Sequence, residues 1–168
     1  MKRTLLAALA LALLAAPALG QWTGTPAKTG DRALDSALET IAKEARTDPD
    51  GWVKTVSLRH AIPEADLRVA RDTHRLEPAD VFMASALAHL TGRPVLTVAE
   101  TYRRNEGKGW GVVAREMGIR PGSPQFHELK KGARGSADRL KAAAKERHRM
   151  AKQAEKQKGK PEGKEKPR

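Results

Sequence analysis

The chain has 168 residues, and 32 Lys and Arg against 20 Asp and Glu give it a net charge of +12. It contains no cysteine, which excludes disulfides, thiol nucleophiles and lipid attachment through a cysteine. The charge is uneven, because residues 133–168 hold thirteen basic and five acidic side chains, a net of +8, whereas residues 21–132 carry only +2. We therefore expect a nearly neutral folded body followed by a basic tail that meets anionic surfaces.

The first twenty residues are typical of a secretory signal peptide. Two basic residues precede an apolar stretch, residues 5–16, which is too short to span a membrane because a spanning helix takes about 20 residues. Small residues then lead to a cleavage point expected between Gly20 and Gln21. This pattern predicts a periplasmic or secreted protein with no transmembrane segment in the mature chain. Residues 21–30 contain Gly, Thr and Pro without any period and are expected to form a flexible leader.

The body, residues 31–132, shows the apolar periodicity of about seven short helices and no alternating stretch long enough for a strand. Its length suits one domain with one core. In chain order, the helices are expected to begin near Asp31, Trp52, Pro63, Pro78, Pro94, Trp110 and Ser123. The fourth contains the run VFMASALAHL, which is apolar on most of its surface and is therefore expected at the centre. We predict an all-α fold, a compact bundle of αα-hairpins.

Three junctions between these helices share one pattern: a small residue, then Gly or Ala four residues later, then a proline. They are centred on Ala61, Gly92 and Gly118. The Gly or Ala is expected to end one helix and the proline to begin the next, while the small residue lets the two helices approach closely. The spacing between the junctions is too irregular for a solenoid, so the pattern favours a bundle of hairpins.

The tail, residues 133–168, has good helix formers but almost no apolar stripe, so we expect a solvated, frayed helix at most. Disorder is expected from Gln157 onward. The tail is expected to bind lipopolysaccharide, anionic lipid or extracellular nucleic acid in a salt-sensitive manner. Base stacking and deep membrane insertion are disfavoured, because no aromatic residue and few apolar residues lie among the basic ones. An unstructured extension that only keeps the protein soluble is the alternative.

The stretch GKGWGVVAREMGIRPGS, residues 107–123, has the least ordinary composition in the body. Its glycines match neither the GxGxxG dinucleotide motif nor the P-loop, which argues against a phosphate loop. We expect Gly107 and Gly109 to end the fifth helix with positive φ. Gly111 is expected to let Trp110 lie flat against a neighbouring helix.

The preferred binding surface joins this stretch to the helix that follows it. The candidate residues are Lys108, Trp110, Arg115, Arg120, His127 and Lys130. The sequence contains no catalytic constellation, no cofactor motif and no HxxxH or HExxH metal motif. We therefore expect a non-enzymatic binding module of the cell envelope, whose partner is an unknown protein or envelope component. Two alternatives stay open. A helix-turn-helix-like corner over residues 110–131 predicts nucleic-acid binding, and Glu116 or His127 as acid–base residue predicts a cell-wall enzyme.

The body also resembles a group of uncharacterised small secreted bacterial helical proteins. The resemblance covers residues 56–132 and is carried by the pattern GKGWGxxAxExGIxPGSxxFHxLK, which this chain shows from Gly107 to Lys130. It implies a secreted helical domain and transfers no catalytic or ligand-binding residue. The basic tail lies outside it.

Overall fold

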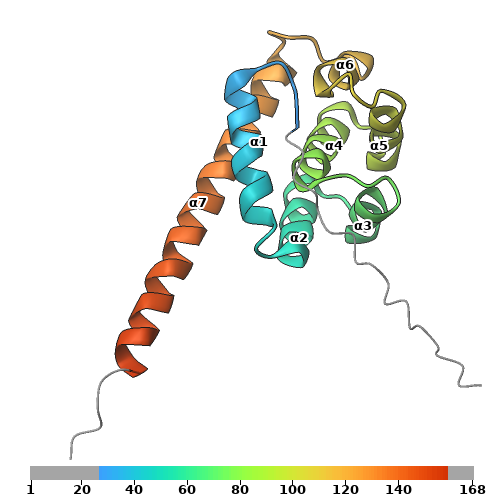
Figure 1. Ribbon diagram of the computed structural model, residues 1–168. Helices are drawn as coiled ribbons and strands as arrows, with labels where there is room; N and C mark the ends of the chain where they lie inside the picture. The colour runs from blue at the N-terminus through green and yellow to red at the C-terminus, as the bar shows by residue number, and fades with distance from the viewer. Residues whose placement is uncertain (1–26, 159–168) are drawn as a thin grey trace, which may run out of the picture.

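The structure, a computed structural model, describes residues 27–158, and over that range the chain forms seven helices and no strand (Figure 1). The helices are α1 (Arg32–Ala45), α2 (Pro49–His60), α3 (Glu64–Asp72), α4 (Pro78–Thr91), α5 (Val95–Arg104), α6 (Trp110–Glu116) and α7 (Pro124–Lys158). The predicted all-α fold is confirmed. The predicted signal peptide, its cleavage point, residues 21–26 of the leader and residues 159–168 of the tail lie outside the described residues.

Helix α4 is the centre of the molecule, as its apolar sequence predicts. Every residue from Pro78 to Ala88 is buried, and the helix packs against α1, α2, α3, α5 and α7 (Figure 1). Phe82, Met83 and Leu87 on α4 are among the largest fully buried side chains of the described residues. Burial on all sides explains why the helix carries no polar face.

The helix starts follow local capping chemistry. The Asp31 carboxylate accepts a hydrogen bond from the Leu34 amide at 2.9 Å and caps α1, as expected. Helix α2 begins three residues before the predicted start, because the Asp48 carboxylate accepts from the Gly51 amide at 2.9 Å and Pro49 takes the first helical position. Residues 49–51, which the predicted start left outside this helix, form its first turn.

The three predicted corners have the expected backbone. Ala61, Gly92 and Gly118 all adopt left-handed φ angles, of 53°, 68° and 89°. In the first and third corners, the amide of the following isoleucine donates back to the small residue, from Ile62 to the Ser57 carbonyl at 3.2 Å and from Ile119 to the Ala114 carbonyl at 2.8 Å. This is the Schellman arrangement, which satisfies carbonyls that the helix end leaves free.

Of the three corner residues, Ala61 alone has a side chain in the left-handed region. Ala61→Gly is expected to raise the free energy of unfolding by about 0.5–1 kcal/mol. The strain of a β-carbon in this region outweighs the additional conformational entropy that glycine loses on folding. Urea unfolding measures the change. Gly92→Ala, which introduces the same strain at the second corner, is expected to lower the free energy of unfolding by about 1 kcal/mol. A stability loss in Ala61→Gly would contradict the left-handed backbone at this corner.

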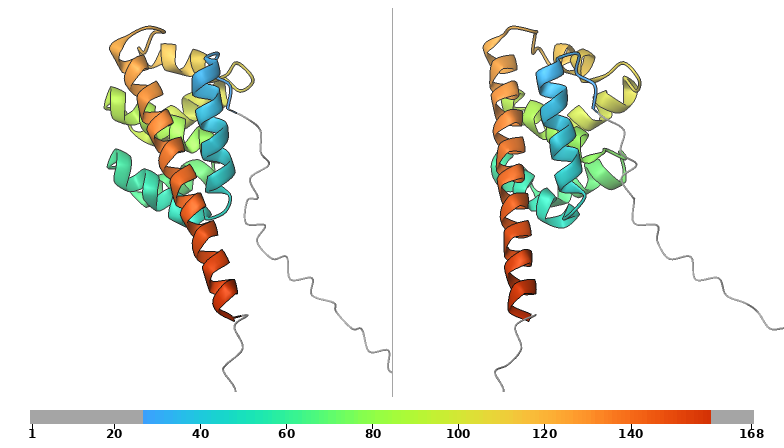
Figure 2. Two further views of the ribbon diagram at one scale, coloured as in Figure 1. Left: turned by 90° about the vertical axis from the view of Figure 1, so that its left-hand side faces the viewer. Right: turned by 60° about the vertical axis from the view of Figure 1, so that its left-hand side comes forward.

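The boundary expected at residue 132 is wrong, because it falls inside the continuous helix α7. Leu129, Ala133 and Ala137 are buried and Leu140 packs on the same core. The small side chains of Ala133 and Ala137 let α7 lie against α1, and the two helices run side by side in the same direction (Figure 2). A sparse apolar stripe is therefore enough to dock the helix, and α7 stays in contact with α1 as far as Arg147, which pairs with Glu44 at 3.3 Å.

Beyond this contact, α7 projects past the body as an isolated helix (Figures 1 and 2). Residues 145–157 are all exposed, and helical structure continues to Lys158, so the expected fraying and the expected disorder from Gln157 are not seen before residue 158. The docked first half supplies a helical nucleus, and the good helix formers that follow extend it. No helix within residues 27–158 has an apolar stretch long enough to cross a bilayer.

Candidate functional site

Trp110, the central residue of the glycine-rich stretch, is wholly buried rather than part of a surface. Its indole Nε1 donates a hydrogen bond of 2.6 Å to the carboxylate of Asp80, which lies in the first turn of α4. The Tyr102 ring stacks on the indole with centroids 4.3 Å apart and planes 11° apart. The stretch thus anchors α6 to α4 and α5, and Trp110 supports the predicted binding surface only from beneath.

The glycines on either side of Trp110 serve a close approach of two backbones. The segment before α1 passes over the start of α6, where the Trp110 amide donates to the Lys28 carbonyl at 2.7 Å. A β-carbon on Gly109 would lie 2.7 Å from the Lys28 carbonyl oxygen, and one on Gly111 would lie 2.7 Å from that of Thr29. Position 111 must therefore be glycine because the passing segment leaves no room for a side chain. This reason differs from the one expected from the sequence, the flat packing of Trp110.

This passing segment, residues 27–31, belongs to the fold. Ala27 is buried, and both the amide and the hydroxyl of Thr29 donate to the Asp35 carboxylate, at 2.9 Å and 2.7 Å. We call residues 27–31 the strap. Gly107 and Gly109 have φ angles of 83° and 80°, which confirms the expected positive φ. The unusual composition of residues 107–111 is thus accounted for by the strap, the buried Trp110 and the end of α5.

The Asp80 carboxyl is the most perturbed acid of the described core. Burial raises its pKa to about 6, while hydrogen bonding, first from Trp110, opposes the rise. A carboxyl whose pKa is higher in the fold than in the unfolded chain favours folding when it is protonated. Its contribution is therefore fully present below about pH 4 and is lost as the pH rises through about 6.

We compare the free energies of unfolding of Asp80→Asn and the wild type at two pH values. The difference is expected to change by about 3 kcal/mol in favour of the variant between about pH 4 and about pH 7.5, because a rise in the pKa of Asp80 from 3.8 to about 6 corresponds to that free energy. The amide oxygen can still accept from Trp110, so the variant keeps the core hydrogen bond. Urea unfolding followed by circular dichroism at a series of pH values gives the difference curve. A difference that does not change with pH would contradict the burial of this carboxyl.

The other predicted surface residues lie on two parts of the molecule. Lys108, Arg115 and Arg120 are exposed around α6, and the Lys108 amine donates to the Asn105 side chain at 3.3 Å. His127 and Lys130 lie in the first turns of α7 instead. Lys130 is engaged in an ion pair of 2.6 Å with Asp31, the N-cap of α1. Their role in binding stays a prediction.

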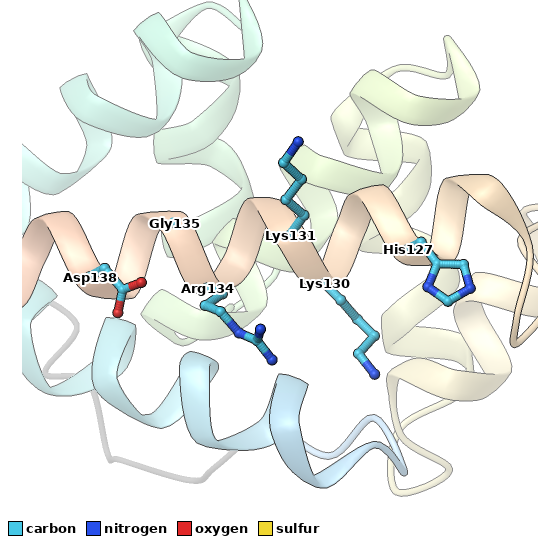
Figure 3. Close-up of a pocket in the computed structure, with 6 residues that line it drawn as sticks. All are labelled: His127, Lys130, Lys131, Arg134, Gly135 and Asp138. Atoms are coloured by element: carbon cyan, nitrogen blue, oxygen red, sulfur yellow. The ribbon is translucent and has the colours of Figure 1, made fainter.

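His127 and Lys130 share a shallow hollow of about 390 Å³ with Lys131, Arg134, Gly135 and Asp138 (Figure 3). Figure 3 shows Lys130 and Arg134 extending from α7 toward α1, whereas Lys131 extends away from α1. All four side chains that carry or can take up a positive charge here come from consecutive turns of one helix. The hollow is the beginning of a longer feature.

Charged and histidine side chains recur every three or four residues along the outer face of α7. We call this set the basic ridge, and it consists of His127, Lys131, Arg134, Asp138, Lys141, Lys145, His148, Lys152 and Lys156, all exposed. At 100° per residue these positions fall within an arc of about 100°, and the set is about 44 Å long. Asp138 is its single acidic member.

The six Lys and Arg side chains of the basic ridge form no ion pair with any described residue. Off the ridge, Arg147 pairs with Glu44 at 3.3 Å and Arg149 pairs with Glu146 at 2.7 Å. Lys130 is paired as well. Arg139, also off the ridge, donates to the Gly135 carbonyl at 3.1 Å and forms no ion pair with a described residue. Six of the unpaired cations of α7 thus lie on one face.

The two candidate acid–base residues have separate surroundings. Both carboxylate oxygens of Glu116 accept from the Asn105 amide at 3.1 Å, which joins the end of α6 to the end of α5. His127 lies in the hollow on α7 among cations. The described residues contain no group of three or more His, Cys, Asp or Glu side chains arranged to hold a metal ion. The enzyme alternative thus gains no support from this arrangement.

The helix-turn-helix alternative would use α6 and the start of α7. Helix α6 has seven residues, and seven more, Met117–Ser123, separate it from α7, whereas the motif has a turn of about 3–4 residues. The start of α7 also packs along α1 and α4. No feature of this corner favours nucleic-acid binding, which stays a prediction.

Fold and site together define a small helical protein whose most prominent surface feature is a basic ridge on a projecting helix. Comparison of the chain with protein-family models, curated proteins and solved structures finds no match. The ridge was missed by sequence reasoning because the assumed boundary at residue 132 divided it, although its spacing of three and four residues is visible in the sequence.

Proposed function

We propose that the protein is a non-enzymatic binding module, exported as its first twenty residues predict, that docks on a phosphate-bearing anionic lipid surface through the basic ridge. The observation that carries the proposal is the collection of unpaired cations on one exposed face of α7. They are Lys131, Arg134, Lys141, Lys145, Lys152 and Lys156. The ridge takes the place of Trp110 as the centre of the proposed surface.

The shape of the ridge favours a lipid surface over a duplex. A straight helix about 44 Å long can bring each ridge cation to a flat array of headgroups, whereas the phosphates of a duplex curve away from a straight rod. Five of the six cations, including all four beyond residue 140, are Lys, which act as point charges and lack the planar fork of Arg. The ridge also contains no Trp, Tyr or Phe side chain for base stacking.

The chemistry of α7 further favours attachment to the surface without insertion. Met150 is its only large apolar side chain that is well exposed among the described residues, so little apolar area is available to enter the acyl region. Each cation near an anionic leaflet contributes about 1 kcal/mol, and the attraction falls off within a Debye length. Binding should therefore be electrostatic, reversible and sensitive to salt.

Vesicle sedimentation of the mature chain tests the proposal. We expect the protein to pellet with vesicles that contain phosphatidylglycerol at low salt, to be released at about 0.5 M salt, and to ignore vesicles of phosphatidylcholine alone. Equal binding to the neutral vesicles, or binding that salt leaves unchanged, would refute it. If duplex DNA displaces the protein from the anionic vesicles at a phosphate concentration below that of the lipid, the ridge would be assigned to nucleic acid instead.

A further inference from the structure

The first and second helix corners meet at a pocket of about 380 Å³ on a different part of the fold from the basic ridge. The last residue of α2, His60, and the exposed His89 in the last turn of α4 both line it. Asp66 and Arg93 supply one charge of each sign to the same lining. Both histidines lie within three residues before the left-handed residue of their corner, which brings chain segments about 30 residues apart to one place.

His60 is the unexplained group in this pocket. Its side chain is only 9% exposed, and neither ring nitrogen has a hydrogen-bond partner. A neutral imidazole has one donor and one acceptor, and leaving both unpaired in a core is costly. The Phe82 ring, with its centroid 5.6 Å away, supplies only an edge contact.

His89 lies where a shared ligand of the two imidazoles can be placed. The two ring centroids are 5.7 Å apart and the ring planes are inclined by 61°. When two imidazoles bind the same metal ion, each through a nitrogen at about 2.0–2.1 Å, tetrahedral angles at the metal place the ring centroids about 5–6 Å apart. We propose that His60 and His89 form a two-histidine site for a divalent transition-metal ion of the kind that imidazole binds, with Zn²⁺ as its representative.

The protonation state of His60 agrees with this role. Burial, assisted by the charges of Arg59 and His89, lowers its pKa to about 4, so the ring is neutral and able to act as a ligand at neutral pH. The described residues bring no third protein ligand to the pair, so water fills the remaining positions. Asp66 attracts a cation to the pocket and Arg93 repels it, and the affinity is accordingly modest.

Zn²⁺ titration of the full mature chain by isothermal calorimetry tests the site. We expect one ion to bind per chain, and His89→Ala to weaken binding by about tenfold or more because one of two protein ligands is lost. His89 is exposed, so this variant keeps the core intact. His127→Ala removes an equally exposed histidine from α7 and is expected to bind Zn²⁺ like the wild type.

The ring resonances of His60 in NMR spectra supply the second readout, and they are expected to shift on addition of Zn²⁺ in the wild type and in His127→Ala but not in His89→Ala. Zn²⁺ binding that His89→Ala leaves unchanged, or saturation without any shift at His60, would overturn the proposal. Absence of saturable binding would overturn it as well. Because the pocket and the ridge are separate, none of these outcomes changes the expected binding to vesicles.

Discussion

Gly109→Ala is expected to lower the free energy of unfolding by about 2–6 kcal/mol. The residue has φ 80° and ψ 167°, a region open almost only to glycine, and a side chain there costs about 1–3 kcal/mol. The new β-carbon would also lie 2.7 Å from the Lys28 carbonyl oxygen, and such overpacking costs about 1–3 kcal/mol more. Urea unfolding followed by circular dichroism measures the sum.

Two neighbouring glycines separate the two causes. Gly107 has φ 83° and open space around it, so Gly107→Ala is expected to cost only the strain, about 1–2 kcal/mol. Gly111 lies inside α6 without positive φ, and a β-carbon there meets the Thr29 carbonyl oxygen at 2.7 Å. In an open helix, Gly111→Ala would stabilise the fold by about 1 kcal/mol. The strap is expected to reverse that sign.

The sign at Gly111 decides whether the strap lies where the structure places it. A gain in stability for Gly111→Ala would show that residues 28 and 29 do not cover α6, and the cost at Gly109 would then fall to that at Gly107. Shortening the chain so that it begins at Gly30 supplies the matched background. In that shorter chain, Gly111→Ala is expected to become stabilising.

Replacing the four ridge lysines beyond residue 140, Lys141, Lys145, Lys152 and Lys156, by Gln is expected to weaken binding to phosphatidylglycerol vesicles about a thousandfold. Each lysine near the surface contributes about 1 kcal/mol, so that four contribute about 4 kcal/mol. All four are exposed and free of ion pairs with described residues, so the fold should be unaffected. Vesicle titration at fixed low salt measures the loss.

A body variant with the same loss of charge is the control. Arg32, Lys43, Arg46 and Lys54 are exposed on or beside α1 and α2 and form no ion pair with described residues. Their replacement by Gln should reduce binding less than about tenfold, because only the general attraction of the protein is weakened. Equal losses in the two variants would show that net charge, rather than the ridge, governs binding.

The sequence predicted well what local chemistry decides. The proline and glycine signals placed the corners, Asp31 and Ser123 cap their helices as expected, and the apolar run of α4 indicated its central position. These features depend on residues within one or two turns of each other. Only the start of α2 was misplaced, because Asp48 and Pro49 are as suitable for a helix start as for a turn.

Contacts between distant segments could not be predicted in this way. Nothing local shows that the strap crosses α6, so the need for Gly111 was assigned to the wrong neighbour. Trp110 was assigned to the candidate binding surface together with the glycine-rich stretch around it, and its partner Asp80 lies 30 residues earlier. The docking of α7 was missed because Ala133 and Ala137 look too small to hold a helix, although small residues permit close approach to α1.

The parts of the chain that hold the fold are distinct from the part proposed to bind. The strap, Trp110 and Asp80 fix α6 to the body, and the body in turn fixes the first half of α7. The second half then projects with its cations on one face. Rigid presentation of this kind reduces the entropy that is lost when the ridge meets its partner.

The most direct test of the basic ridge compares two faces of the projecting helix. The chain has no cysteine, so single cysteines can be placed at His148 on the ridge and at Ala154 on the opposite face, both exposed, and labelled with a fluorophore. On phosphatidylglycerol vesicles, the label at 148 should become shielded from a water-soluble quencher while the label at 154 stays accessible. Equal shielding at both positions, or shielding at 154 alone, would contradict the basic ridge as the binding surface.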